Sequence, residues 1–139
     1  MGGMTHAVLN HNVLAENFSF LGDWEDRYAY LIDLGKNLPV FPDGQKNDDT
    51  FVRGCTSQVW MINTTENQDV ISFLADSDAH IVRGLIAVLY AVYQQQTKDF
   101  VRTFPIDEYF TRLGLQEHLS PNRRNGFFAM VKRIQDMAA

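Results

Sequence analysis

The chain has 139 residues, 45% of them hydrophobic and 21% charged, which predicts a single domain over residues 1–139. Its 12 lysines and arginines against 17 acidic residues give a formal net charge of −5, so nucleic acid is not an expected partner. The longest apolar run, residues 85–93, is far shorter than the roughly 20 residues of a membrane-spanning helix. We therefore expect a cytoplasmic protein with no membrane partner.

The amino-terminal end lacks an apolar stretch long enough for an export signal. Residues 1–9 match no folded pattern, and we expect them to be flexible or a remnant of cloning.

The first half of the chain begins with two predicted helices. Apolar spacing indicates a weak helix over residues 10–18. A firmer helix follows Asp23, whose side chain can cap it, with Asp26 as a carboxylate variant of the capping box. Gly35 ends this helix, and the residues 36–50 contain prolines and polar side chains typical of a surface loop.

A small antiparallel sheet is predicted next. Residues 57–63 are rich in β-forming side chains, residues 64–68 form a turn, and residues 69–74 are the expected antiparallel mate. Phe51 and Val52 are predicted to add a third short strand. Cys55 then lies in a connection beside the sheet.

The second half is predicted to be helical. Ser77 and Asp78 are expected to start the strongest helix, with Asp78 in its first turn. Three shorter helical pieces are predicted next: one after Thr97, one over residues 107–113 and a turn through Glu117. A last helix starts with Ser120 as its cap and Pro121 in its first turn. The expected core faces of the two long helices are Ile81, Val82, Leu85, Ile86, Leu89 and Val92, and Phe127, Met130, Val131, Ile134 and Met137. The fold class is therefore α+β, with about three strands packed against helices.

The chain contains one cysteine, Cys55. A single thiol cannot form an intramolecular disulfide or supply a cysteine-based zinc or iron–sulfur site. Its four histidines, His6, His11, His80 and His118, show no metal-ligand spacing, and there is no glycine-rich phosphate loop. We expect no bound metal and no bound cofactor.

The surroundings of Cys55 favour a reactive thiol over an inert one. A free cysteine most often packs as a small hydrophobe, but Cys55 follows Arg53 and Gly54 at a junction between loop and strand. Gly54 permits close approach of another molecule, and Arg53 can favour the thiolate. Two alternatives remain open: a cysteine hydrolase with His80 or His118 as base, and an adaptor with an incidental cysteine.

Six blocks of the sequence resemble the SufE family of sulfur-acceptor proteins. The central block is Val52-Arg53-Gly54-Cys55-Thr56-Ser57-Gln58-Val59-Trp60, and the resemblance runs from about Phe18 to Ile134. This block resembles SufE itself more than its paralogue CsdE. The other blocks are Asp23-Trp24-Glu25-Asp26-Arg27-Tyr28, Leu34-Gly35 with Leu38-Pro39, Asp76-Ser77-Asp78-Ala79 with Ile81-Val82 and Gly84-Leu85, Leu113-Gly114-Leu115, and His118-Leu119-Ser120-Pro121 with Arg123 and Gly126.

The resemblance implies a fold and a function. The family's α+β fold is shared with NifU-type scaffold proteins. Its members accept persulfide sulfur from a SufS-type or CsdA-type cysteine desulfurase, which carries pyridoxal phosphate, and pass it to a SufBCD-type scaffold for iron–sulfur cluster assembly. Cys55 matches the acceptor. The protein is then a sulfur-transfer partner that stimulates a desulfurase rather than an enzyme with its own turnover.

The resemblance also implies site roles for other residues, and each of them has a purely structural explanation as an alternative. Arg123 falls where the family places an arginine near the cysteine, although it also suits a helix surface. Asp78 is assigned to the interface or to control of the cysteine loop, or simply to a helix first turn. Gln58 is carried over as support of the sulfur site or a partner contact, although it and Trp60 also suit a purely structural place in the strand. Gly84 and Gly126 are expected to mark close packing. Arg53 and Gly54 support the site, and we expect the Cys55 loop to be partly sheltered and to move on docking.

Overall fold

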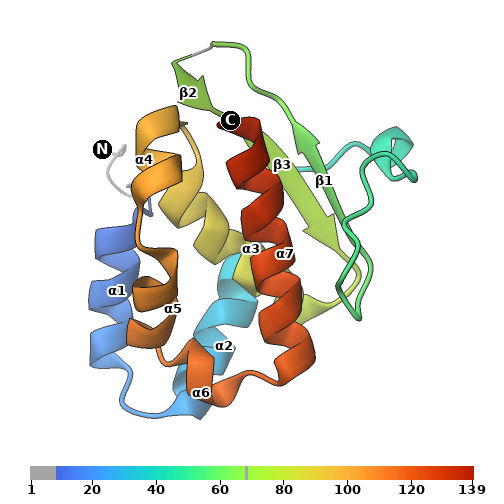
Figure 1. The fold of residues 1–139 in the computed structure, drawn as a ribbon. Helices are drawn as coiled ribbons and strands as arrows, with labels where there is room; N and C mark the ends of the chain where they lie inside the picture. The colour runs from blue at the N-terminus through green and yellow to red at the C-terminus, as the bar shows by residue number, and fades with distance from the viewer. Residues whose placement is uncertain (1–8, 68) are drawn as a thin grey trace, which may run out of the picture.

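A computed structural model describes residues 9–67 and 69–139 of the chain, so the expectation for residues 1–9 lies, apart from Leu9, outside the described residues. Along the chain, helices α1 and α2 come first, short strands precede and follow α3, and short helices lead to the long α7 (Figure 1). The elements are α1 (His11–Phe20), α2 (Trp24–Gly35), the 3-10 turn η2 (Asp43–Gln45), β1 (Val59–Asn63), β2 (Val70–Ile71), β3 (Phe73–Ser77), α3 (His80–Tyr93), β4 (Gln96–Thr97), α4 (Lys98–Thr103), α5 (Ile106–Arg112), α6 (Leu115–His118) and α7 (Pro121–Met137).

Capping side chains lie where the sequence predicted helix starts. The Asp23 carboxylate accepts a hydrogen bond from the Asp26 amide at 2.9 Å, and the Ser120 hydroxyl accepts one from the Arg123 amide. Thr97 caps α4 in the same way. Each bond satisfies an amide that the first helical turn leaves without a partner, so the predictions for α2, α4 and α7 are confirmed.

The predicted hairpin exists, but its second strand is displaced. Strand β1 pairs antiparallel with β3, from Val59 opposite Ser77 to Asn63 opposite Phe73. The predicted mate, residues 69–74, was therefore wrong in its bounds. Phe73, Ala75 and Ser77 form the buried face of β3, and this burial fixes the register. Strand β2 pairs with β4 instead, and Phe51 forms one bridge to Trp60 rather than a strand.

The start of α3 also differs from the prediction. The helix begins at His80, and Ser77 is the last residue of β3. The Ser77 hydroxyl donates to the Gln58 carbonyl at 2.7 Å and accepts from the Ala79 amide. Because this hydroxyl is engaged beside the strand, it caps no helix, and Asp78 precedes the first turn instead of lying in it.

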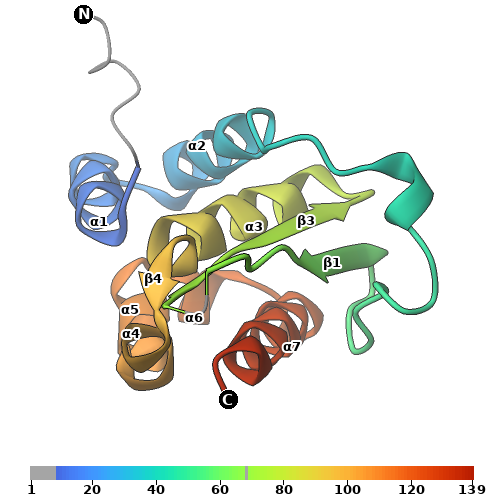
Figure 2. The same ribbon diagram turned by 90° about the horizontal axis from the view of Figure 1, so that it is seen from above.

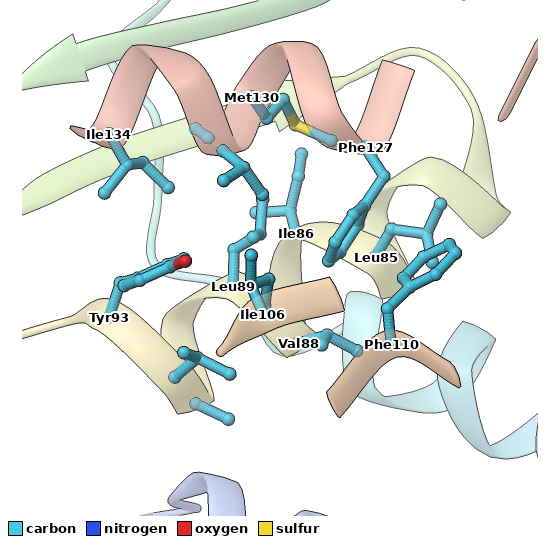
Figure 3. Close-up of a cluster of buried hydrophobic side chains, with 14 of the residues drawn as sticks. Leu85, Ile86, Val88, Leu89, Tyr93, Ile106, Phe110, Phe127, Met130 and Ile134 are labelled. Carbon is cyan, nitrogen blue, oxygen red and sulfur yellow. The ribbon is translucent and has the colours of Figure 1, made fainter. Parts of the chain in front are cut away.

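Helix α3 is the centre of the core. Figure 2 shows α2 and α7 on opposite sides of it. Its predicted apolar face is buried throughout, and Figure 3 shows Leu85 and Leu89 of α3 facing Phe127 and Met130 of α7. The antiparallel strands and the helices together make an α+β fold. None of the helices in the described ranges has the length and apolar character needed to cross a membrane.

Candidate functional site

The cysteine loop, residues 53–58, projects from a closed base. The Val52 amide donates to the Val59 carbonyl, and the Met61 amide donates to the Thr50 carbonyl, both at 2.8 Å. From α7, Arg133 donates to the Phe51 carbonyl at 3.0 Å. Gly54 turns the chain inside the loop with a φ of 96°, a conformation that residues with a Cβ rarely adopt. The two ends of the loop are therefore held while its tip carries Cys55.

The Cys55 side chain packs against the first half of α7. Its Sγ–H donates to the Gly126 carbonyl across 3.7 Å, and the residue is partly buried. A Cβ built on Gly126 would lie 3.2 Å from this sulfur. The predicted close packing at Gly126 is confirmed, and the neighbour it accommodates is the thiol.

A cavity of about 310 Å³ adjoins the thiol and is called the Cys55 cavity below. Its apolar wall is Val82 and Leu85 of α3 with Phe127 and Met130 of α7. Its polar lining is Thr56, Ser57, Ser120, Asn122 and Arg123. The structure thus brings Cys55 and Arg123 together from distant parts of the chain.

Burial controls the ionisation of Cys55 in this conformation. Loss of solvent raises the pKa of the thiol above its ordinary value, because the anion is the less favoured form in an apolar setting. Arg53 does not offset this effect: it is exposed and its guanidinium lies over the Phe51 ring, 5.8 Å from the centroid. The expected support of a thiolate by Arg53 is therefore not realised here. Of the described side chains, Arg123 alone brings a charge to the cavity lining.

Asp78 holds the far end of the cysteine loop. Its carboxylate accepts a hydrogen bond from the Gln58 amide at 3.0 Å, while Ser77 contacts the Gln58 carbonyl. Both polar backbone groups of Gln58 are therefore bound, and its side chain is exposed. Trp60 lies in β1 as predicted, half-buried under the Lys46 ammonium.

The histidines in the described part of the chain do not reach Cys55. His118 stacks on Trp24 at 4.7 Å, His80 is exposed at the start of α3, and His11 lies in an aromatic cluster. None of these three lines the Cys55 cavity. No cluster of three or more metal-ligating side chains occurs within residues 9–67 and 69–139. Among the described residues, the arrangement offers a sheltered thiol and a nearby cation, with no histidine in the cavity lining to act as a base.

Several lining residues escaped the sequence analysis. Ser120 was assigned only as a helix cap, Asn122 was not singled out, and Phe127 and Met130 were assigned to the core. The glycine at 126 within a helical pattern was a usable signal, because a helix interior tolerates glycine where another group approaches closely. It indicated close packing but not the identity of the neighbour.

Comparisons with known proteins give a family model, two relatives and a solved structure. The family model described as "SufE: Fe-S metabolism associated domain" matches residues 12–138. The chain is 43% identical over 128 residues to an uncharacterised SufE-like protein of Rhizobium etli, covering 90% of this chain and 86% of the relative. It is 41% identical to an uncharacterised SufE-like protein of Rhizobium meliloti, covering 90% and 91%. The solution structure of a hypothetical protein from Thermus thermophilus has the same fold, with a TM-score of 0.73, 19% identity and 92% of each chain covered.

Proposed function

Because this chain belongs to the SufE family, we propose that it carries sulfur for iron–sulfur cluster assembly, accepting it on Cys55 from a cysteine desulfurase. The observation that carries the proposal is the position of the Cys55 thiol beside a sheltered cavity lined by Arg123. The expected donor is of the SufS or CsdA type and carries its own pyridoxal phosphate. The expected recipient is a SufBCD-type scaffold.

The reaction is a thiol exchange. The Cys55 thiolate attacks the terminal sulfur of the donor's Cys–S–SH, a new S–S bond forms on Cys55, and the donor's S–S bond breaks. The electron pair of the broken bond leaves with the donor cysteine as a thiolate. The proton stays on the transferred sulfur as the bond forms, so the first products are Cys55–S–SH and the donor thiolate. Release of that proton to solvent leaves the Cys55 persulfide as an anion. No oxidant or reductant is consumed.

The site suits a carrier rather than a hydrolase. Relay chemistry needs one nucleophile and no water-activating base, and no described histidine lines the Cys55 cavity. Cys55 is the only cysteine in the sequence, so no second thiol of this chain can displace the bound sulfur as sulfide. The cavity has room for the added atom, which lies about 2.05 Å from Sγ in such a bond.

Transfer requires the cysteine loop to move. In the resting structure Sγ faces α7 and donates to the Gly126 carbonyl, so a donor protein cannot reach it in line from that side. Val52 is paired with Val59, and Gln58 is bound by Asp78 and Ser77, so the tip of the loop, residues 53–57, is the part that swings outward. Docking of the desulfurase supplies the contacts that favour the outward form.

Mass spectrometry tests the proposal. Incubation with a SufS-type desulfurase and free cysteine is expected to add one sulfur, about 32 Da, to the wild type and nothing to Cys55→Ser. Thiol-specific reduction must then remove that mass. An unmodified wild-type chain would support the adaptor alternative, whereas ester or amide hydrolysis without a partner would support the hydrolase.

A further inference from the structure

Gly126 lies where α7 and the cysteine loop are in contact. It is buried in the first half of a helix of 17 residues, where glycine costs about 1 kcal/mol relative to alanine. Such a cost needs a local reason. The nearest atoms to a Cβ built at this position are the Sγ, Cβ and Cα of Cys55, at 3.2, 3.5 and 3.7 Å.

The contact has a chemical side as well as a steric one. The Gly126 carbonyl accepts from the Cys55 Sγ–H, and a carbonyl oxygen repels a thiolate. The bare Cα leaves room for the sulfur, and the oxygen favours its protonated form. Together they form a seat for the thiol at the edge of the Cys55 cavity.

We infer that Gly126 is a positioning residue for Cys55, which holds the thiol in an inward, weakly nucleophilic form, and that a side chain at this position shifts the cysteine loop outward. The inference rests on the proposed function for its meaning, since it describes the resting state of the carrier. It concerns the free protein and requires no partner for its test.

The steric argument sets the direction of the shift. The nearest neighbours of position 126 are atoms of Cys55 at the tip of a loop, whereas Gly126 itself is fixed by helix α7 packed on α3. The loop moves more easily than the helix. Gly54 lies next to Cys55 and provides the torsional freedom for this movement.

The charged groups near the thiol do not oppose an outward shift of the cysteine loop. Arg123 lines the cavity from the first turn of α7, Arg53 in the loop faces Phe51, and Asp78 before α3 binds the Gln58 amide. An outward loop carries Cys55 away from the apolar wall and into solvent. The thiol then regains ordinary ionisation and reacts faster at neutral pH.

Alkylation with iodoacetamide between pH 6 and pH 10 tests the inference on Gly126→Leu. We expect a second-order rate constant at pH 7 roughly tenfold above wild type. The midpoint of the pH profile should fall toward the ordinary thiol pKa of 9.0. Asn125→Leu is the matched control, since it introduces the same side chain at the adjacent exposed position, and it must leave the profile unchanged. A folded Gly126→Leu that reacts with the wild-type rate and midpoint would overturn the inference.

Two further variants keep the result decisive. Gly126→Ala retains helicity and places only one carbon beside the sulfur, so it must show a smaller rise of about twofold to fivefold. If Gly126→Leu does not fold, an unchanged Gly126→Ala overturns the inference. Leu14→Ala destabilises α1, which does not line the cavity, and an equal rise in that variant would assign the effect to global unfolding and also overturn it. Because no desulfurase is present, failure here is distinct from failure of sulfur transfer.

Discussion

Gly35 of α2 and Gly84 of α3 meet where these two helices cross, so closely that a Cβ built on Gly35 would lie 2.7 Å from the Gly84 nitrogen. A Cβ built on Gly84 would clash even more closely, with the carbonyl oxygen of Leu31 in α2. Both obstacles are backbone atoms, which cannot rotate away. This crossing seats α2 on one side of the core helix whose other side forms the Cys55 cavity.

Gly84→Ala is expected to destabilise the protein. Overpacking against the Leu31 backbone outweighs the ~1 kcal/mol that alanine gains in a helix, for a net loss of about 1–3 kcal/mol in the free energy of unfolding. Urea denaturation measures it. Gly22→Ala is the control, since its Cβ would meet no atom within 4 Å. Equal stability of Gly84→Ala and wild type would show that the two helices separate freely.

Tyr90→Phe is expected to weaken the packing of α3 against β3. The Tyr90 hydroxyl accepts a hydrogen bond from the Ala75 amide at 2.9 Å, and burial raises the pKa of this hydroxyl to about 12. Phenylalanine keeps the stacking on Phe73 but leaves the buried amide without an acceptor, at a cost of about 1–3 kcal/mol. Chemical denaturation checks this loss, and an unchanged midpoint would mean that water replaces the hydroxyl.

The parts of the fold that the sequence predicted are those set by local chemistry. Asp23 with Asp26, and Ser120 with Pro121, mark helix starts because the capping bond spans only three residues. Strand pairing depends on contacts between distant residues. The mate of β1 lies at Phe73–Ser77 because of which side chains the core buries, and no local pattern in residues 69–77 shows this.

The candidate site likewise has features that the sequence predicted and contacts that depend on the fold. The solitary Cys55 and its loop were evident from residue types, and the resemblance pointed to Arg123. The contact between Cys55 and Gly126 joins residues 71 positions apart, so it exists only after α7 packs beside the sheet. Asp78 was assigned either to the interface or control of the cysteine loop, or to a helix first turn. Its carboxylate binds the Gln58 amide at the end of that loop, 20 positions away.

The stability of the protein is expected to depend on the ionisation of Cys55 at alkaline pH. Burial raises the pKa of the folded thiol above the ordinary value of 9.0, so the unfolded chain loses its proton first as the pH rises. The stabilising contribution is therefore complete below about pH 9 and declines as the pH passes through the folded pKa. Thermal denaturation of wild type and Cys55→Ser from pH 7 to 10.5 measures it. Parallel losses in the two proteins would contradict a shifted thiol.

Arg123→Met is expected to slow sulfur transfer without loss of stability. Arg123 is exposed at the edge of the Cys55 cavity, where its charge attracts an anionic persulfide, and removing it should lower the transfer rate by roughly threefold to tenfold at low salt. Added salt must then slow the wild type more than the variant, because it screens an attraction that only the wild type has.

Arg124→Met is the matched control in the next position of α7. Arg124 donates to the Leu119 and Gln116 carbonyls at 2.7 and 3.2 Å, so its loss is expected to cost about 1–3 kcal/mol of stability while the transfer rate at 25 °C stays near wild type. The two neighbouring arginines thus separate a role toward the sulfur from a role in the fold. Equal transfer rates for wild type and Arg123→Met at every salt concentration would remove Arg123 from the site and leave the apolar wall and the seat at Gly126 as the features that receive the sulfur.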